Sequence, residues 1–204
     1  MSDLIVIRHG ETEWSRTGQH TGRTDIPLTA RGEEQAKALA PWVSGRKIAR
    51  VFVSPLVRAR KTAALAGLPT SGDAFVLEPD LQEWDYGGYE GKITHDIQQQ
   101  HPGWSLWTDG VIPGDAAHPG ESIGQVAARL DRVIARVRAA LAEDRGDVVT
   151  VAHGHSLRTL SARWLEQEPQ FGARLRLDPA HVSILGFEAG VTVIKEWNLV
   201  PHGG

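Results

Sequence analysis

The sequence contains no cysteine. Disulfides, thiolate nucleophiles and zinc–thiolate sites are therefore excluded, and the absence fits a reducing compartment. The chain also lacks an apolar run long enough to cross a membrane, and its N-terminus lacks the basic region and apolar stretch of a signal peptide. We therefore expect a cytoplasmic protein with no membrane partner.

The chain carries little net charge. Its 22 Lys and Arg residues nearly balance 25 Asp and Glu residues, which gives a formal net charge of −3. This balance does not suggest a nucleic-acid partner, so any anion binding has to come from a local cluster of arginines. With 204 residues, 41% of them hydrophobic, and no internal repeat, we expect residues 1–204 to form a single domain. The sequence leaves the oligomeric state open, a homo-oligomer included.

Tyrosine is scarce, whereas tryptophan is not: the chain has two tyrosines and seven tryptophans. Trp84, Trp104 and Trp107 fall in one loop-rich region near Tyr86 and Tyr89. Two interpretations stay open. These rings pack the core of a subdomain, or they form a pocket wall that excludes water from a reacting centre.

Compact β-branched runs at residues 4–7, 50–54 and 148–152 are typical of buried strands in a parallel sheet. Near the end of the chain, residues 182–187 and 191–197 flank a short Glu-Ala-Gly segment and predict a hairpin or edge strands.

Helical patterns alternate with these strands. Thr29 is placed to cap a helix over residues 30–43, which Pro41 should bend or end early. After the second strand, Pro55 fits the first position of a helix that includes residues 58–65.

The clearest helix begins near Ser122 and ends near Gly146, with apolar residues at spacings of three and four. A last helix starts near Ser156. Residues 81–119 break the alternation, because they are rich in Gly, Trp, Asp and Pro and contain one short helix candidate at 94–100. We expect an α/β fold, a three-layer α/β/α arrangement with a mostly parallel central sheet and this insertion as a cap over the C-terminal ends of the strands.

Basic residues follow the predicted strand ends. Arg8 and His9 end the first strand, Ser54 ends the second with Arg58 one helical turn on, and His153 ends the third. Ligands collect beyond the carboxyl ends of strands in such sheets, so these side chains should meet. The fixed charge of Arg8 opposes a metal ion at His9 and favours an anion. If the anion is a phosphate, a neutral imidazole nitrogen of His9 is a competent nucleophile toward phosphorus.

A phosphate monoester also needs a proton for its leaving oxygen. Glu83 is the best candidate, because it lies in the insertion beside Trp84, an aromatic that could desolvate it and raise its pKa. Asp85 is the competitor. Glu11 lies so near His9 that its carboxylate would repel the phosphate, and we expect it to pair with an arginine or cap a loop.

The chain resembles the histidine phosphatase superfamily, which has the phosphoglycerate mutase-like fold. The matching segments are Arg8-His9-Gly10-Glu11-Thr12, Thr21-Gly22-Arg23-Thr24-Asp25-Ile26-Pro27-Leu28-Thr29, Ser54-Pro55-Leu56-Val57-Arg58-Ala59-Arg60-Lys61-Thr62, Gly120-Glu121-Ser122 and Ala152-His153-Gly154-His155. The resemblance implies that His9 becomes phosphohistidine and that Glu83 donates the proton. It also implies that Arg8, Arg58 and His153 bind the phosphoryl oxygens. With two arginines and a protonated His153 to neutralise those oxygens, we expect no metal and no cofactor.

Hydrolysis is favoured over phosphoryl transfer within the substrate. Mutases of this superfamily carry Asn where this chain has Ser15 and His155, and a pair of adjacent arginines that residues 81–121 lack. The pattern looks most like the branch that contains sedoheptulose-1,7-bisphosphatase and small acid phosphatases. The segments that carry this likeness are Glu83-Trp84-Asp85-Tyr86-Gly87-Gly88-Tyr89-Glu90-Gly91, Trp104-Ser105-Leu106-Trp107-Thr108-Asp109-Gly110 and His153-Gly154-His155-Ser156-Leu157-Arg158.

The expected partner is a small phosphorylated metabolite, and a sugar bisphosphate is one option. The residues that we expect to bind it, besides the five named for the chemistry, are Ser15, Thr21, Gly22, Tyr86, Gly154, His155 and Arg158. Arg158 lies one helical turn beyond His155, so it either holds a second phosphate or is a surface arginine on an amphipathic helix. Mutase-type transfer and a non-catalytic phosphate-binding protein are the alternative functions, and the metabolite itself stays open.

Overall fold

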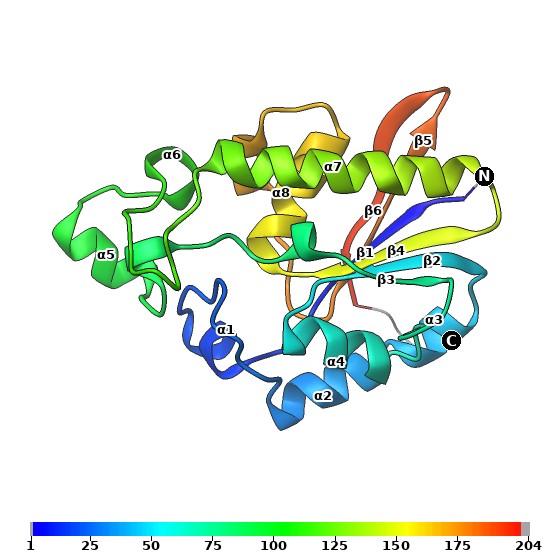
Figure 1. The fold of residues 1–204 in the computed structure, drawn as a ribbon, viewed down its shortest axis with the longest axis horizontal. Coiled ribbons are helices and arrows are strands. Elements are labelled where there is room, and N and C mark those ends of the chain that lie inside the picture. The colour runs from blue at the N-terminus through cyan, green and yellow to red at the C-terminus, as the bar shows by residue number, and fades with distance from the viewer. Residues whose placement is uncertain (1, 201–204) are drawn as a thin grey trace.

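A six-stranded sheet runs through the computed structural model, which describes residues 2–200 (Figure 1). The strand order is β3-β2-β4-β1-β5-β6; the first four strands are parallel, and β5 and β6 are antiparallel to their neighbours. The strands are β1 (Leu4–Arg8), β2 (Ile48–Val53), β3 (Phe75–Leu77), β4 (Asp147–Ala152), β5 (Val182–Glu188) and β6 (Val191–Leu199). The predicted α/β fold with a mostly parallel sheet is confirmed.

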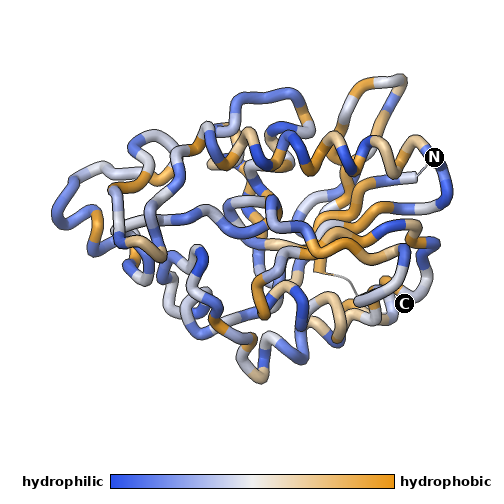
Figure 2. The backbone as a smooth tube through the Cα atoms, viewed as in Figure 1, coloured by the Kyte–Doolittle hydropathy of each residue, from blue (hydrophilic) through white to orange (hydrophobic). Residues whose placement is uncertain are grey.

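The β-branched runs form the centre of this sheet. β1 pairs with β4 in the register Leu4↔Val148 to Arg8↔Ala152, so the two strands end side by side. In Figure 2, the hydrophobic residues of these strands are the orange segments in the middle of the sheet. The hairpin of β5 and β6 is also confirmed, whereas β3 was missed because it has only three residues, at the edge of the sheet.

Helices cover both faces of the sheet. They are α1 (Glu13–Thr17), α2 (Ala30–Lys37), α3 (Ala40–Ser44), α4 (Val57–Leu65), α5 (Thr94–Gln100), α6 (Leu106–Asp109), α7 (Ile123–Ala142) and α8 (Gly154–Trp164), with 3-10 turns η1 (Pro79–Leu81), η2 (Gly87–Tyr89) and η3 (Pro169–Arg174). On one face, side chains of α7 and α8 pack against Leu4 and Val148. On the other, α3 and α4 pack against Ile5 and Val149. The alternation of side chains along each strand therefore produces two cores, one on each side of the sheet.

The helix expected over residues 30–43 is two helices. Thr29 caps α2 as predicted, since its hydroxyl accepts from the N–H of Gly32 at 3.0 Å. Pro41 lies in the first turn of α3. Proline has no N–H to donate to the carbonyl of Lys37 four residues earlier, so α2 ends there.

Two helix starts differ from the sequence-based expectation. α4 begins at Val57, whose N–H donates to Asp25 Oδ1 at 2.8 Å, and Pro55 lies outside the helix. α8 begins at Gly154, two residues before Ser156, because contacts from the insertion bind its first N–H groups. α7 begins as predicted, with Ser122 and Gln125 in a reciprocal capping box.

The insertion lies beyond the C-terminal ends of β1 and β4 (Figure 1). It contains α5 at the expected place and also α6, which the sequence did not predict. Ser105 caps α6 by accepting from the N–H of Trp107 at 3.3 Å. The insertion therefore covers the edge of the sheet where Arg8 and His153 lie.

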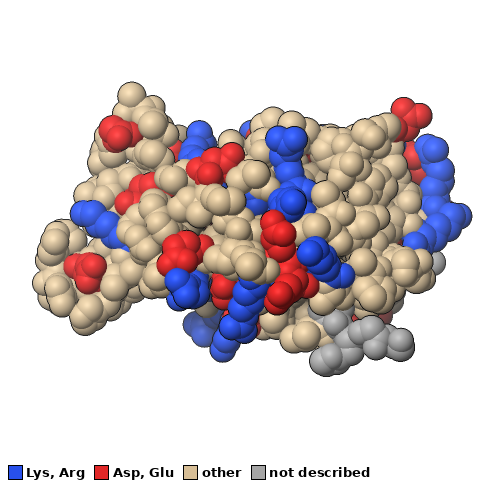
Figure 3. Space-filling view, turned by 90° about the horizontal axis from the view of Figure 1, so that it is seen from below, with Lys and Arg blue, Asp and Glu red and all other residues tan. Residues whose placement is uncertain are grey.

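Acidic and basic side chains interleave on the face shown in Figure 3. On the helices of that side, Lys61 lies 3.7 Å from Glu33. Within residues 2–200, no helix has both the length and the apolar character needed to cross a membrane.

Candidate active site

A cavity of about 250 Å³ lies between the end of β1, the start of α8 and the insertion. The predicted site residues that line it are Arg8, His9, Ser15, Thr21, Glu83, Tyr86, Gly154, His155 and Arg158. Residues from five separated parts of the sequence therefore meet at one edge of the sheet, as the strand-end rule requires. Arg58, His153 and Gly22 do not line this cavity.

His9 presents an unprotonated Nε2. Its Nδ1 lies 2.7 Å from the carbonyl oxygen of Gly10, and because a carbonyl only accepts, Nδ1 holds the ring proton. Burial, followed by the positive charges of Arg58 and Arg8, holds the pKa of His9 well below its ordinary value. The imidazole is therefore neutral at physiological pH, and Nε2 carries the lone pair that a nucleophile needs.

Arg8 reaches the cavity from the end of β1. Its Nη1 donates to the Leu177 carbonyl at 2.6 Å, and its Nε has no partner within the described residues. A Cβ at Gly154 would lie 3.3 Å from Cζ of Arg8, so glycine lets the start of α8 approach the guanidinium. Burial lowers the pKa of Arg8, but the group stays charged at neutral pH.

His153 and Arg58 are fully buried next to His9. The ring centroids of His9 and His153 are 5.1 Å apart. Arg58 Nε donates to His153 Nδ1 at 3.1 Å, and His153 Nε2 lies 2.7 Å from Ser54 Oγ. Burial, followed by the charge of Arg58, holds the pKa of His153 well below its ordinary value. The expectation of a protonated His153 is wrong, because lost solvation and a neighbouring guanidinium both disfavour a second positive charge.

Arg58 also organises the loop that follows α1. Its Nη1 donates to the carbonyl of Thr24 at 3.0 Å, and its Nη2 donates to the carbonyl of Gly22 at 2.7 Å. A Cβ at Gly22 would lie 2.5 Å from Glu90 Oε2 and 2.6 Å from the carbonyl of Trp84. Gly22 thus permits a close backbone approach and helps to hold Arg58, and it does not face the cavity.

The carboxylate of Glu83 is held at the N-terminus of α8. Oε1 accepts from the N–H groups of Trp84 and Ser156 at 2.9 and 2.8 Å, and Oε2 accepts from the N–H of His155 at 2.9 Å. The indole Nε1 of Trp84 donates to the carbonyl of Glu121 at 2.7 Å. Backbone amides, rather than the Trp84 ring, therefore bind the carboxylate, and Oε2 keeps a lone pair available for a proton.

The two other carboxylates near the site bind elsewhere. Asp85 is fully buried outside the cavity, and its Oδ2 lies 3.5 Å from Nε of Arg23. Glu11 accepts from the hydroxyl of Thr29 at 2.9 Å and lies 3.9 Å from Arg31. The predicted pairing of Glu11 with an arginine is confirmed, and of these three carboxyl groups only that of Glu83 lines the cavity.

Ser15 and Thr21 combine a place on the cavity wall with local structural roles. The N–H of Thr12 donates to Ser15 Oγ at 2.8 Å, and the N–H of Ser15 donates to Thr12 Oγ1 at 3.1 Å, which caps α1. The hydroxyl of Thr21 donates to the carbonyl of Gln19 at 3.3 Å. Both hydroxyl oxygens can still accept a hydrogen bond from a ligand.

Sequence reasoning missed His20, Gln19 and Thr94, which also line the cavity. The ring of His20 lies 4.8 Å from that of Tyr86, and its Nε2 lies 3.3 Å from the hydroxyl of Thr94. Burial lowers the pKa of His20 to about 4, so the ring is neutral at physiological pH. One signal was available, because His20 directly precedes the matched Thr21-Gly22 segment.

Tyr86 and His155 form a hydrogen-bonded pair of neutral side chains on the cavity wall. The Tyr86 hydroxyl lies 2.6 Å from Nδ1 of His155. Burial raises the pKa of Tyr86 well above its ordinary value, and burial followed by the charge of Arg158 holds the pKa of His155 well below its own. This part of the cavity therefore offers uncharged hydrogen-bonding groups.

Arg158 supplies a positive charge beside that neutral pair. Its Nε donates to the carbonyl of Gly172 at 2.9 Å, its Nη2 to the carbonyl of Ala173 at 3.1 Å, and Cζ lies 4.7 Å from the ring centre of Trp107. Burial lowers its pKa. Arg158 is thus held in place by η3 and Trp107 while it lines the cavity.

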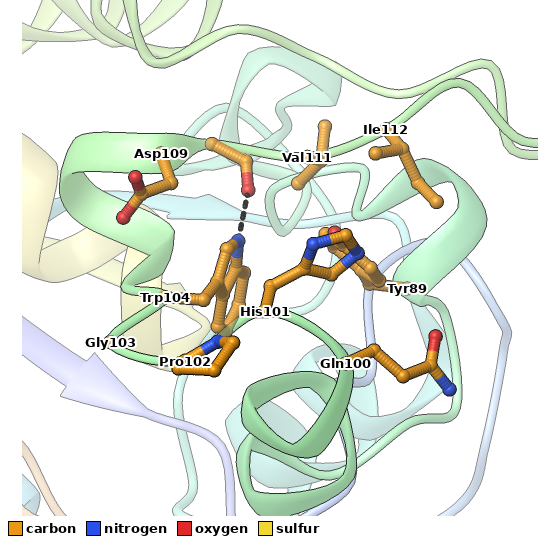
Figure 4. Close-up of a pocket in the computed structure, with 10 residues that line it drawn as sticks. Tyr89, Gln100, His101, Pro102, Gly103, Trp104, Asp109, Val111 and Ile112 are labelled. Atoms are coloured by element: carbon orange, nitrogen blue, oxygen red, sulfur yellow. Dashed lines mark hydrogen bonds between the residues drawn. The ribbon is translucent and has the colours of Figure 1, made fainter.

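The tryptophans of the insertion form a core rather than the wall of this cavity. Trp84, Trp104 and Trp107 are 0%, 6% and 8% exposed. Trp104 borders a separate hollow of about 510 Å³, where its Nε1 donates to the carbonyl of Gly110 at 3.1 Å (Figure 4). None of the predicted site residues lines that hollow.

Within residues 2–200, no group of three or more His, Asp and Glu side chains is placed to hold a metal ion. The expectation that the reaction needs no metal and no cofactor stays a prediction.

Comparison with known proteins identifies the family. The histidine phosphatase superfamily (branch 1) matches residues 4–200, so the chain belongs to the histidine phosphatase superfamily. An acid phosphatase of Mycobacterium tuberculosis is 37% identical over 201 residues, which cover 98% of this chain and 93% of that protein. The sedoheptulose 1,7-bisphosphatase of Saccharomyces cerevisiae is 37% identical over 186 residues, which cover 78% of this chain and 66% of that protein.

The structural comparison agrees. A structure solved for an open reading frame of Mycobacterium tuberculosis matches with a TM-score of 0.86 and 37% identity, covering 98% of each chain. The resemblance to the branch with sedoheptulose bisphosphatase and acid phosphatase is therefore confirmed, and the chain is a phosphoric monoester hydrolase.

Proposed function

We propose that this chain hydrolyses phosphate monoesters of small phosphosugars or related metabolites through a phosphohistidine at His9. The observation that carries the proposal is the unprotonated Nε2 of His9 in a cavity that also contains Arg8 and the carboxyl group of Glu83. A nucleophile, a fixed positive charge and a proton donor are the groups that this reaction needs without a metal.

In the first step, Nε2 of His9 attacks phosphorus. The new P–N bond forms as the bond from phosphorus to the ester oxygen breaks, and protonated Glu83 gives its proton to that oxygen from Oε2. Arg8 offsets the charge on the three remaining oxygens from within the cavity, and its unpartnered Nε supports this role. Arg58 does not line the cavity, so it adds only the longer-range effect of its buried charge, which also acts on His9. His153 acts as a neutral neighbour that orients the site rather than as a cation.

In the second step, the Glu83 carboxylate removes a proton from water as the water oxygen attacks phosphorus. The P–N bond breaks, phosphate leaves, and the imidazole of His9 and the protonated Glu83 are restored. Because uncatalysed hydrolysis of phosphate monoesters is so slow that enzymes accelerate it up to about 10²¹-fold, the loss of any of these groups should be severe.

The rest of the cavity supports a phosphorylated sugar as the substrate class. Tyr86, His155 and His20 are neutral hydrogen-bonding side chains, which fit hydroxyl groups, and Arg158 adds one charge for a second anionic group. A cavity of about 250 Å³ fits a small metabolite, and the absence of a nucleic-acid partner stays a prediction. A single domain over residues 1–204, a cytoplasmic location and a homo-oligomer as an option are parts of this proposal that stay predictions.

The test combines a substrate panel with trapping of the intermediate. Sugar mono- and bisphosphates and glucosyl phosphoglycerate are assayed for released phosphate, and 3-phosphoglycerate is followed by NMR for isomerisation. ³²P-labelled substrate is quenched in alkali, which preserves phosphohistidine. We expect phosphate release and a labelled enzyme, and we expect His9→Ala to abolish both. The matched control is His95→Ala, because His95 is an exposed histidine on α5.

Three results would contradict the proposal. Phosphate release by His9→Ala at the wild-type rate would show that the reaction does not pass through a phosphohistidine at His9. Isomerisation of 3-phosphoglycerate that exceeds phosphate release makes the chain a mutase. Binding of phosphosugars without turnover of any of them makes it a non-catalytic binding protein.

A further inference from the structure

A buried arginine on α7 lies against the segment that carries Glu83. Arg129 is 7% exposed. Its Nη1 donates to the carbonyls of Asp80 and Gln82, both at 2.7 Å, and its Nη2 donates to the carbonyl of Glu83 at 3.1 Å. Its Nε and Nη2 also bind Oε1 and Oε2 of Glu121, at 2.9 and 3.0 Å. Every N–H of the guanidinium therefore has an acceptor.

Arg129 supplies hydrogen-bond donors that the backbone carbonyls of this segment otherwise lack. Gln82 and Glu83 lie outside any helix or strand, so their carbonyls have no helix or sheet partner and need other donors. A planar guanidinium can serve several carbonyls at once, which an apolar side chain of the same volume cannot. Glu121 balances the buried charge: burial alone would raise the pKa of Glu121, and the hydrogen bond and charge of Arg129 bring it below its ordinary value.

Glu121 extends the same contact past Glu83. Its Oε2 also accepts from the N–H of Asp85 at 3.0 Å, and its carbonyl accepts from the indole of Trp84 at 2.7 Å. Arg129 and Glu121 therefore hydrogen-bond the backbone before, at and after Glu83, namely at the carbonyls of Gln82 and Glu83 and at the N–H of Asp85. On the opposite side, the Glu83 carboxylate binds the N–H groups of His155 and Ser156.

We propose that Arg129, together with Glu121, is a positioning residue that sets the place of the Glu83 carboxyl group relative to His9. Arg129 does not line the cavity, so its hydrogen bonds reach the site only through the segment that carries Glu83. The inference rests on the proposed role of Glu83 as the proton donor. A displacement of about 1 Å in a reacting group can lower a rate about 10²-fold, so a modest loosening of this segment should be measurable.

The leaving group distinguishes positioning from general support of the fold. An alkoxide leaving a sugar phosphate needs the proton of Glu83, whereas nitrophenolate leaves p-nitrophenyl phosphate without one. A misplaced Glu83 should therefore slow the sugar phosphate far more than the aryl phosphate, and a general weakening of the fold should slow both alike.

The experiment measures kcat/KM, which reports formation of the phosphoenzyme, for both substrates. We expect Arg129→Lys, which keeps the charge and loses the planar fork, to lower kcat/KM for the sugar phosphate by about 10²-fold through kcat. For p-nitrophenyl phosphate we expect a loss below tenfold. Glu121→Gln should show the same selectivity and is the second variant if Arg129→Lys does not fold. The matched control is Arg132→Lys on the same helix, which pairs with the exposed side of Asp80 and should show no selectivity.

Glu83→Gln separates the inference from the proposed function. In that background, Arg129→Lys should cause no further loss, because the group that it positions is gone. Equal losses on both substrates, or an additive loss in the double variant, would overturn the positioning role. If Glu83→Gln itself shows no preference between leaving groups, the proton donor of the proposed function is wrong, and the inference falls with it.

Discussion

Nε of Arg58 lies 3.1 Å from Nδ1 of His153, and this contact determines which ring nitrogen of His153 carries the proton. A guanidinium only donates hydrogen bonds, so Nδ1 must accept and the proton is on Nε2. Nε2 in turn lies 2.7 Å from Oγ of Ser54, which is fully buried and can accept. Arg58, His153 and Ser54 therefore form a directed chain of hydrogen bonds with a neutral imidazole at its centre.

Ser54→Ala should destabilise the protein. The variant leaves Nε2–H of His153 buried without an acceptor, which costs about 1–3 kcal/mol of unfolding free energy. Urea denaturation at neutral pH measures the effect. The matched control is Ser44→Ala, whose exposed hydroxyl donates to the Pro41 carbonyl and whose loss should change stability by less than about 0.5 kcal/mol. Equal stability of the two variants would contradict the chain of hydrogen bonds.

His20 should make stability depend on pH in the acid range. Its pKa in the folded chain is about 4, below the ordinary value of 6.5. Well above pH 6.5, His20 is neutral in both the folded and the unfolded chain. As the pH falls from 6.5 to about 4, the unfolded chain binds a proton that folded His20 does not, so the free energy of unfolding decreases by about 3 kcal/mol.

His20→Gln should remove that part of the decrease, as measured by urea denaturation at several pH values across this window. The buried His9, His153 and His155 also have lowered pKa values and keep a residual slope in the same direction. His95→Gln is the control, because His95 is exposed on α5. A variant at His20 with the wild-type slope would show that this ring is not a neutral buried group.

Gly154→Ala should reduce activity without reducing stability. The new methyl group would lie 3.3 Å from Cζ of Arg8 and push the guanidinium by a few tenths of an ångström. We expect kcat/KM to fall about tenfold, in line with the sensitivity of reacting groups to small displacements. The thermal midpoint should change little, because the three atoms nearest to the new Cβ all belong to the side chain of Arg8 and none to the backbone.

Gly124→Ala on α7 is the control for that change. A Cβ there would meet only the Ser122 hydroxyl, at 3.9 Å, so activity should be unchanged. If both alanine variants keep full kcat/KM, the close approach of α8 to Arg8 does not matter for the reaction.

Arg158→Ala should separate substrates by the number of their phosphates. If Arg158 holds a second anionic group, its loss should raise KM for a sugar bisphosphate about 10–100-fold, the equivalent of one charged hydrogen bond. KM for p-nitrophenyl phosphate should change little. Arg163→Ala on the same helix is the control, because Arg163 pairs with Asp131 on α7. An equal rise in KM for both substrates after Arg158→Ala would show that Arg158 does not bind a second phosphate.

Local sequence signals were sufficient for most of the fold. The β-branched runs of β1 and β4 and the capping box at Ser122 act over a few residues, so they can be recognised in the sequence. β3 has three residues and no such signal, and it forms because β2 offers it an edge. The early start of α8 likewise depends on a carboxylate 72 residues away in the chain, the side chain of Glu83.

The sequence by itself determined that the ends of β1 and β4 and the start of α8 meet at one edge, because strand ends and helix starts of an α/β sheet converge there whatever the details of packing. Arg8 and His9 could therefore be named in advance, and Glu83 was named from the need of the leaving oxygen for a proton. Only the tertiary structure decided the charge of each group and the partners that hold it. His153 was expected to be a cation and is neutral, and Arg129 was not singled out and binds the segment of Glu83. Burial and neighbouring charges set protonation, and both arise from residues that are distant in the sequence.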